Sequence, residues 1–249
     1  MRDKLTISSK IISAEAEKLG LNLSSEQIDQ LTEFCSILTR FNQHTNLVAN
    51  CEADVLLRDH VLDSLSLSGL IKPGRKDVST SLIDIGSGGG FPGLVLAIAQ
   101  PTMAVALVEA TGKKARFLSE AITILSLDQR VQVFNQRAEL MAHNAAYRRR
   151  FDYATCRAVG TLATVLELTL PFLKTGGVAL IQRSAAQAQM EEKPALKEVK
   201  RLKAELIGIV YPDEKVLTKA RAILQLQQKN PVPNIYPRPW PKPKEAPLF

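Results

Sequence analysis

Cysteine, histidine and long apolar runs are scarce in this chain. Three histidines and three widely spaced cysteines, with no Cys-x-x-Cys pair, occur among 249 residues. This pattern favours free thiols in a reducing compartment over a disulfide framework or a zinc site. No apolar run approaches the length of a membrane span, and residues 1–10 lack the apolar core of a secretory signal. We therefore expect a cytoplasmic protein that contacts no membrane and binds no metal.

Acidic residues are outnumbered by basic ones. The chain has 32 Lys and Arg against 25 Asp and Glu, a formal net charge of +7. Such an excess favours a polyanionic partner such as nucleic acid. A chain of 249 residues with 45% hydrophobic residues can bury a full core in one large domain and still carry a smaller part.

The middle of the chain alternates short apolar runs with segments of helical periodicity. Repeated strand–helix units predict a parallel sheet covered by helices on both faces, with the ligand at the carboxyl ends of the strands. We predict helices at 113–125 and at 162–173, the second ending at Gly176-Gly177, and a polar helix interrupted near Pro194. The predicted strands are a run from Ser81, then 104–108, 131–134, 151–157 and 178–182, and two more near 207–211 and 222–227.

The first seventy residues have the pattern of helices. Ser24 and Gln27 form a capping box ahead of one helix, and a second helix is predicted over 54–68, with Gly69 as its end. The predicted organisation is a helical part at 1–72, a ligand-binding domain at 73–228 and a Pro-rich basic tail at 229–249.

The tail allows two interpretations. Its prolines favour extended chain, and Arg238, Lys242 and Lys244 with Tyr236 and Trp240 suit phosphates and unstacked bases. With the sheet complete near residue 227, removing such a tail should spare folding and cofactor affinity. The competing interpretation is a structural strap that packs its aromatic residues against the domain.

A glycine cluster follows the first predicted strand. Its spacing, Asp84-x-Gly86-x-Gly88-x-Gly90, differs from the G-x-G-x-x-G of dinucleotide enzymes. Glycines allow a tight turn close to a ligand, and the helix that follows offers free N–H groups. Glu109 ends the second strand, where a carboxylate accepts hydrogen bonds from a ribose diol. The pattern indicates an S-adenosylmethionine site; the alternative is a solvated turn with an incidental glutamate.

A series of linked motifs in fixed order makes the pattern more specific. The motifs are Phe41-Asn42-x-x-Thr45-Asn46-Leu47, Arg58-Asp59-His60-x-x-Asp63-Ser64-Leu65, the loop from Asp84 to Phe91-Pro92-Gly93, Arg137-Ala138-Glu139, Arg157-Ala158 and Tyr236-Pro237-Arg238. From about residue 24 onward the chain resembles the bacterial methyltransferases that make 7-methylguanosine in 16S ribosomal RNA, a family once called glucose-inhibited division protein B. It departs at Ala138, where a valine is common, and after Arg238, where Pro239-Trp240-Pro241 replaces a basic residue and a glycine.

The resemblance implies a Rossmann-like class I methyltransferase, with a mostly parallel seven-stranded sheet behind a small helical part. Its cofactor would be S-adenosylmethionine, its substrate 16S ribosomal RNA or the small ribosomal subunit, and we expect a monomer. By position, the cofactor would be bound by Asp84, Gly86, Gly88, Gly90 and Phe91, on its ribose side by Glu109, Ala110 and Thr111, on its adenine side by Ala138 and Glu139, and near its methionine end by Arg157.

Guanine N7 carries a lone pair and no proton at neutral pH, so its methylation needs placement and no general base. The candidate catalytic residues are Arg157, His60 and Arg137. For His60 the structural alternative is a packed core histidine, and for Arg157 it is an ordinary ion pair at a strand end. The candidate RNA contacts are Asn46 and Arg58 near the cofactor, with Arg238, Lys242 and Lys244 in the tail; His143 and the run Arg148–Arg150 are predicted to be solvated.

Other functions remain open at this point. One is a methyltransferase of the same sheet type with a protein or small-molecule substrate. Another is a non-catalytic RNA-binding or ribosome-assembly module with a relic pocket. An NAD-dependent dehydrogenase is disfavoured by the glycine spacing.

Overall fold

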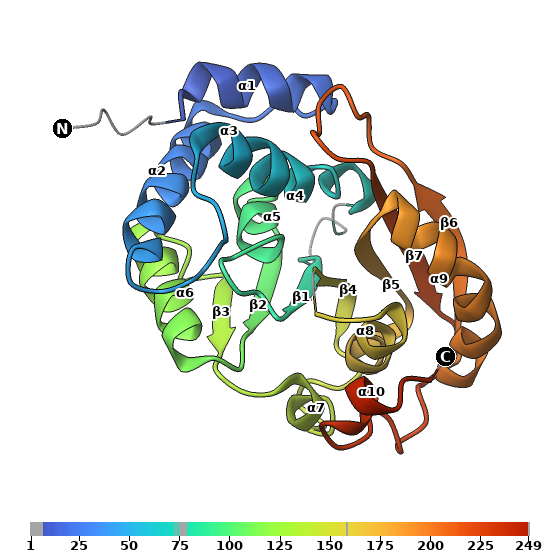
Figure 1. The fold of residues 1–249 in the computed structure, drawn as a ribbon. Helices are drawn as coiled ribbons and strands as arrows, with labels where there is room; N and C mark the ends of the chain where they lie inside the picture. The colour runs from blue at the N-terminus through green and yellow to red at the C-terminus, as the bar shows by residue number, and fades with distance from the viewer. Residues whose placement is uncertain (1–6, 73, 75–78, 158, 249) are drawn as a thin grey trace.

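Seven strands among the described residues form one sheet that separates two layers of helices (Figure 1). The computed structural model describes residues 7–72, 74, 79–157 and 159–248. The strand order is β3-β2-β1-β4-β5-β7-β6; β1 to β5 pair in parallel, and β7 is antiparallel to both β5 and β6. This confirms the predicted fold class. The strands are β1 Ser81–Ile85, β2 Ala104–Val108, β3 Val131–Phe134, β4 Phe151–Cys156, β5 Leu173–Ser184, β6 Ala204–Val210 and β7 Arg221–Gln228.

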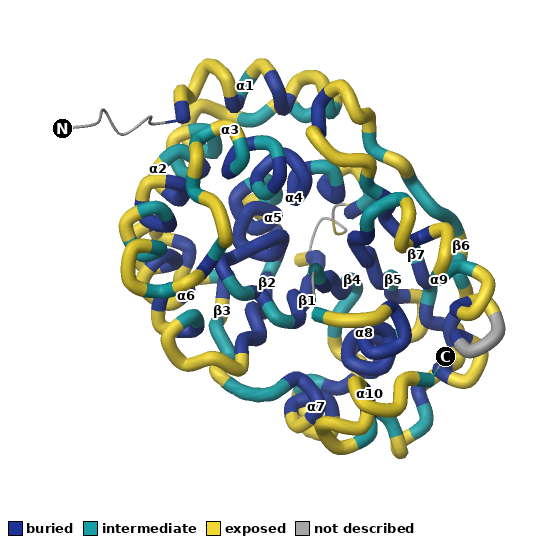
Figure 2. Tube along the Cα trace, in the orientation of Figure 1, coloured by how far each residue is buried: buried dark blue, intermediate teal, exposed yellow. Residues whose placement is uncertain are grey.

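The central strands are buried on both faces, which explains their continuous apolar sequences. Successive side chains of a strand point to opposite faces. Leu82 and Leu107 accordingly join the hydrophobic cluster under the N-terminal helices, whereas Ile83 and Val108 join the cluster on the other face. Figure 2 shows these strands and helix α5 (Gly93–Ala99) as mostly buried, with exposed residues on the outer helices and in the loops.

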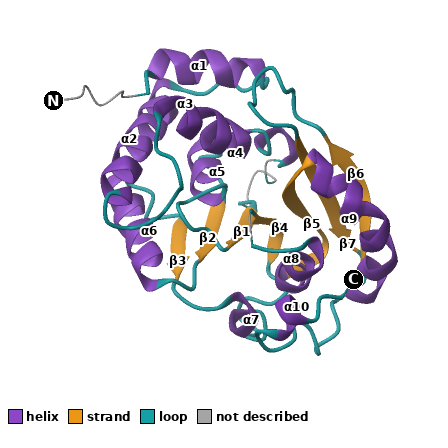
Figure 3. Ribbon diagram, in the orientation of Figure 1, coloured by secondary structure: helices purple, strands orange, loops and turns teal. Residues whose placement is uncertain are grey.

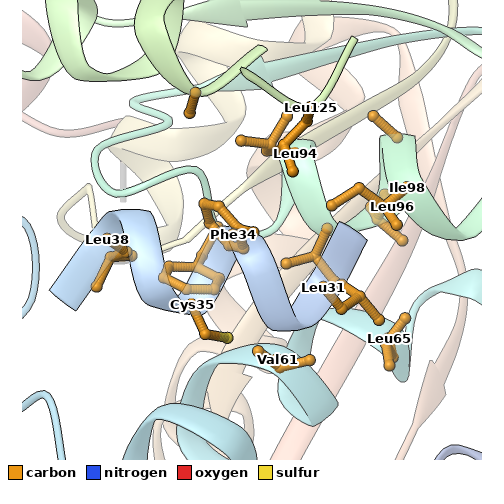
Figure 4. Packing of buried hydrophobic residues seen from close by; sticks show 14 of the residues in the cluster. Leu31, Phe34, Cys35, Leu38, Val61, Leu65, Leu94, Leu96, Ile98 and Leu125 are labelled. Atoms are coloured by element: carbon orange, nitrogen blue, oxygen red, sulfur yellow. The ribbon is translucent and has the colours of Figure 1, made fainter. Parts of the chain in front are cut away.

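The N-terminal helices cover one face of the sheet and share its core. The capping box of α2 is present, and the Gln27 side chain also donates to the carbonyls of Ile98 and Ala99 at the end of α5. Figure 4 shows Leu31 and Phe34 of α2 directed toward Leu94 and Leu96 of α5. The elements of this layer are α1 Ser9–Lys18, α2 Ser25–Asn42, α3 Ala53–Val55, the π-helix η1 Leu56–Leu62, α4 Asp63–Leu65, the 3-10 turn η2 Ser68–Leu70, α5 and α6 Gly112–Ile124.

The other face is covered by helices from the second half of the chain and by its C-terminal segment (Figure 3). These elements are α7 Ala138–Met141, α8 Leu162–Thr169, the 3-10 turn η3 Leu170–Phe172, α9 Ala185–Glu198, the 3-10 turn η4 Val199–Leu202 and α10 Lys242–Glu245.

Three sequence-based boundaries were wrong. The helix predicted at 162–173 is present as α8 and the 3-10 turn η3, which ends at Phe172, but Gly176-Gly177 lies inside β5 and does not end it; a Cβ on Gly177 would meet the Asp152 carbonyl at 3.0 Å. Gly177 therefore permits close strand contact, and Gly176, with a φ of 88°, supplies a left-handed backbone position. Helix α9 continues through the exposed Pro194 because its buried residues Ala188 and Ala195 anchor it on both sides. The helix predicted at 54–68 is divided by the π-helix η1.

Residues 231–248, called here the C-terminal strap, pack against the domain. Arg148 donates to the carbonyls of Val232, Pro233 and Tyr236, and the His143 ring contacts the Pro237 carbonyl at 2.8 Å. The prediction of a solvated Arg148 was therefore wrong, because this buried side chain satisfies backbone oxygens of the strap. His143 is exposed, as predicted, although its ring also contacts the strap. The extended conformation predicted for the tail is interrupted by helix α10, which lies beside α7 and α8 (Figure 1).

Candidate functional site

The glycine loop joins β1 to α5 at the carboxyl edge of the sheet. The N–H groups of Gly86 and Ser87 donate to the Val108 carbonyl, which holds the loop against the end of β2. Gly86 has a φ of 73°, and a Cβ there would lie 2.6 Å from the Val159 side chain. Only glycine fits both the left-handed backbone and this close approach. Gly88 and Gly90 also have positive φ.

Asp84 lies beneath this loop and has no exposed surface. One carboxylate oxygen accepts from the Gly93 N–H at 3.1 Å, and the other accepts from the Thr155 hydroxyl at 3.0 Å. Burial raises the pKa of Asp84 to about 6. The predicted contact between Asp84 and the cofactor does not fit this geometry. The residue instead fixes the loop to α5 and β4.

Glu109 stands at the end of β2 with its carboxylate beside the loop. It accepts from the Gly88 N–H at 2.9 Å and from the Thr111 N–H at 2.7 Å. An ionised carboxylate has about four acceptor positions, so about two remain for a ribose diol. The predicted grouping of Gly88, Glu109 and Thr111 is thus present in the structure.

A cavity of about 220 Å³ opens beside Glu109. Val108, Val159 and Leu168 give it apolar walls, and the Glu109 carboxylate supplies acceptors at one side. This lining suits an adenosine group, whose ring is flat and weakly polar and whose ribose offers two hydroxyls. The residues present fit S-adenosylmethionine. Gly86 leaves a space that a Cβ would fill, and the Glu109 carboxylate offers acceptors to the ribose. The other lining residues are Ile85, Gly86, Ala110, Gln136, Arg137, Ala138, Glu139 and Trp240.

Trp240 belongs to the C-terminal strap and forms part of this cavity's wall. The Arg137 guanidinium lies 4.2 Å from the Trp240 ring centroid and pairs with Glu139. Arg137 therefore lies at the cofactor cavity and not with the other two predicted catalytic residues. The sequence suggested base stacking for Trp240, and nothing local to the tail indicates a contact with Arg137.

Arg157 and His60 are in contact although they lie 97 positions apart in the sequence. Arg157 donates to the Nδ1 atom of His60 at 2.7 Å and to the Asp63 carboxylate at 3.0 Å. Its guanidinium lies 5.1 Å from the Phe91 ring centroid, and the His60 ring lies 4.9 Å from the same centroid. Phe91 thus links the glycine loop to this cluster of Arg157, His60 and Asp63.

The protonation state of His60 follows from its surroundings. Burial, reinforced by the Arg157 cation, lowers the pKa of His60 to about 4. The imidazole is therefore neutral at pH 7 and accepts from Arg157 through Nδ1. Burial raises the pKa of Asp63, although Arg221 and Arg157 oppose that rise. His60 is not a proton donor at neutral pH.

The π-helix η1 explains why these groups converge. Its wider turn carries Asp59 and His60, and α4 continues directly with Asp63. Asp59 accepts from Lys219 and Thr218 in the segment between β6 and β7, and its backbone carbonyl accepts from Arg157 at 3.0 Å. Isolated π turns inside helices are frequent at functional sites.

The two RNA contacts predicted near the cofactor, Arg58 and Asn46, differ in their surroundings. Arg58 binds Asp54 and the Val216 carbonyl, each at 3.0 Å. Asn46 is exposed on a loop that Asn42 holds through the N–H groups of Leu47 and Val48. This loop contacts the glycine loop, since a Cβ on Gly89 would lie 3.4 Å from the Leu47 carbonyl.

The basic residues of the strap divide into two groups. Lys242 and Lys244 are exposed on α10. Arg238 instead donates to the fully buried Glu167 carboxylate through its backbone N–H at 2.7 Å, through Nε at 2.8 Å and through Nη2 at 2.7 Å. The structure therefore uses Arg238 to fasten the strap and leaves the two lysines available to a partner.

Some parts of the predicted site lie elsewhere or outside the described residues. Ala158, the second residue of one motif, is not among the described residues. Within the described ranges, no group of three or more His, Cys, Asp or Glu side chains is arranged to hold a metal ion. None of the described helices is both long enough and apolar enough to cross a membrane. All three cysteines are free thiols, as their spacing predicted.

Comparison with known proteins adds independent findings. The family model of GidB, described as rRNA small subunit methyltransferase G, matches residues 27–215. The curated Ribosomal RNA small subunit methyltransferase G of Dehalococcoides mccartyi (strain CBDB1) is 37% identical over 93% of this chain and 96% of that protein. The protein of the same name from Leuconostoc citreum (strain KM20) is 35% identical over 92% of this chain and 94% of its own length. The solved structure of the O-methyltransferase from Bacillus cereus in complex with SAH has the same fold, with a TM-score of 0.55 over 79% of this chain and 91% of that chain at 14% identity.

Proposed function

The chain belongs to the GidB family, rRNA small subunit methyltransferase G, and on this basis we propose that it methylates N7 of a guanine in 16S ribosomal RNA. The family supplies the reaction class and the substrate class. The observation that supports the choice of atom is the Arg157–His60–Phe91 cluster: Asp63 balances the Arg157 charge, and the neutral His60 imidazole is bonded to the arginine, which suits a reaction that needs no general base. We further propose that the protein acts as a monomer in the cytoplasm, where ribosomal RNA is found.

The cofactor site would use residues of the loop and of the neighbouring strand ends. Glu109 would accept from the ribose hydroxyls, and Val108, Ala138 and Val159 would pack against the adenine. When bound, S-adenosylmethionine supplies an electrophilic methyl group that an in-plane lone pair such as guanine N7 attacks without a general base. Phe91 would lie between this site and Arg157.

The residues of the cluster would act by placement. Guanine N7 has no proton to remove, so a neutral His60 is compatible with the reaction. Asp63 holds the Arg157 guanidinium on one side and His60 holds it on the other. A guanidinium fixed in this way can orient a base or a phosphate and keep water out of the site.

The test is to map 7-methylguanosine in 16S ribosomal RNA from cells with and without the gene. We expect one guanine to lose its modification in the deleted strain. Purified protein should restore it with S-adenosylmethionine, and parallel reactions with naked 16S RNA and with small subunits identify the physical substrate. Unchanged methylation in the deleted strain, or transfer to a protein or a small molecule, would contradict the proposal.

A further inference from the structure

A second cavity lies between the loop that follows α7 and the C-terminal strap. It has a volume of about 670 Å³ and shares no lining residue with the cofactor cavity. None of the described residues in its wall is acidic, and three of them are consecutive arginines. The wall consists of His143, Ala145, Arg148, Arg149, Arg150 and Asn234.

Arg148 is the buried member of this group, with 8% of its surface exposed. Among the described residues its partners are four backbone carbonyls, those of Ala142, Val232, Pro233 and Tyr236. Burial and the neighbouring Arg149 cation lower the pKa of Arg148, but an arginine keeps its charge at neutral pH. Carbonyl groups carry no net charge, so the positive charge of Arg148 is solvated but not balanced.

Arg149 and Arg150 are exposed beside it. Neither guanidinium has an ion-pair or hydrogen-bond partner in the part of the chain that the structure describes. Their backbones are fixed, since their N–H groups donate to the carbonyls of Pro171 at 3.0 Å and Phe172 at 2.9 Å. Arg149 has a φ of 58°, a left-handed conformation that side chains other than glycine rarely adopt. The fold therefore holds like charges close together, and a bound anion would relieve their repulsion.

Phosphate is the anion that suits this wall. Guanidinium groups bind phosphate oxygens through paired N–H donors, and they keep their charge at every physiological pH. The strap also joins the two cavities, because Asn234 lines this one and Trp240 lines the cofactor cavity. The chain between these two residues spans at most about 20 Å. A nucleic-acid strand carries a phosphate every few ångströms, so one bound RNA can reach both cavities.

We propose that this cavity binds the phosphate backbone of the substrate RNA away from the methylated nucleotide. Arg149 and Arg150 make the contacts, and Arg148 adds its charge while it ties the cavity to the strap. This inference rests on the proposed function, since it gives the same RNA a second contact site. Phosphate contacts add affinity for any sequence, so the cavity anchors the RNA and does not select the nucleotide.

The experiment compares three double variants of the full chain with the wild type. Arg149→Gln/Arg150→Gln removes both charges, and Arg149→Lys/Arg150→Lys keeps them. The control is Lys193→Gln/Lys200→Gln, which removes the same charge from exposed residues of α9 and η4. All four proteins should melt within about 2 °C of one another, because surface substitutions of this kind change stability little.

Binding is measured between about 50 and 200 mM KCl on whichever form of the substrate the wild type methylates, naked 16S RNA or small subunits. The glutamine pair at 149 and 150 should reduce the slope of log K against log[KCl] by about 1.5–2, close to one for each lost phosphate contact. The affinity advantage of the wild type should accordingly be about tenfold larger at 50 mM than at 200 mM. The lysine pair and the control should keep the wild-type slope. In methyl transfer the glutamine pair should raise KM and keep kcat, because the contact lies outside the reacting base.

The possible failures are distinguishable. A wild type that transfers no methyl group to RNA overturns the proposed function and this inference with it. An active wild type whose salt slope is shared by the glutamine pair overturns the inference alone, and the cavity then has another occupant. An equal loss of slope in the control overturns it as well, since net charge would explain the effect. The same holds for a loss in the lysine pair, which would separate the effect from charge.

Discussion

Replacing Arg238 by methionine tests whether the C-terminal strap stabilises the fold. Glu167, its partner, is fully buried in α8, while the Arg238 side chain is 21% exposed. The variant keeps the backbone N–H bond to Glu167 and removes the two guanidinium bonds. Removing one partner of a buried ion pair leaves an uncompensated charge and costs about 3–5 kcal/mol. Since one bond remains, we expect the free energy of unfolding to fall by about 3 kcal/mol.

A loss of this size is large in a thermal melt. In a protein of this length each kcal/mol shifts Tm by about 2–4 °C, so Arg238→Met should melt about 6–12 °C below the wild type. The control is Lys242→Met, on the exposed side of α10, which should change stability by less than about 0.5 kcal/mol. The double variant Glu167→Leu/Arg238→Met should recover part of the loss, because it leaves no buried charge.

Arg238→Met and a deletion of the tail together separate the two interpretations of the tail. A strap predicts that deleting residues 236–249 lowers Tm and weakens cofactor binding, because Trp240 is removed from the cavity wall. An RNA-binding arm predicts a wild-type Tm and a smaller salt dependence of RNA binding. If Arg238→Met melts within 1–2 °C of the wild type, by the scale above, and binds RNA with a reduced salt slope, the structural reasoning is refuted.

Three further changes test other parts of the site. Glu109→Ala should weaken S-adenosylmethionine binding by about 2–4 kcal/mol, measured by titration calorimetry, while Glu120→Ala on the exposed side of α6 should not; equal affinities would remove Glu109 from the cofactor site. The single-turnover rate should be flat between about pH 6.5 and 8.5 and stay flat in His60→Asn at a lower level, since the pKa of His60 is about 4; a titration that disappears in the variant would make His60 an acid–base group. In urea unfolding, lowering the pH from about 7.5 to 5 should destabilise the wild type by about 2 kcal/mol more than His60→Asn, because below pH 6.5 the unfolded chain binds a proton that the folded chain does not. Gly93→Ala should lower the free energy of unfolding by about 1–3 kcal/mol, because its Cβ would lie 2.6 Å from Leu107 and 2.7 Å from Asp84. The control is Gly69→Ala, whose Cβ would have nothing within 4 Å. A Gly93→Ala variant as stable as Gly69→Ala would contradict the packing of the loop.

The parts of the fold that could be predicted are those whose signal is local. The strand 104–108 was predicted with its observed bounds, because a parallel strand buried on both faces is a short apolar run. The capping box at Ser24 and Gln27 is also a local pattern. Linked motifs identified His60 and Arg157 as members of one site, and the structure places them in contact.

The parts that could not be predicted depend on distant contacts. Arg238 and Glu167 are 71 positions apart, and the composition around Arg238 equally suits a solvated tail. Arg148 belongs to a basic run that looks solvated, yet its partners are carbonyls near residue 233. Gly176-Gly177 is compatible with a helix end and with a close strand pairing, and only the neighbouring strand decides between them. The orientation of the Gln182 amide could not be predicted either, because it is set by the Asp63 carbonyl on another element.

The place of Trp240 in the cavity wall has a consequence for the order in which the protein becomes complete. A chain is synthesised from its N-terminus, and N-terminal parts fold first. The sheet, the glycine loop and Glu109 all precede Trp240 in the sequence, so they are synthesised before the strap. The cofactor cavity gains its final wall only when the C-terminal strap packs against α8.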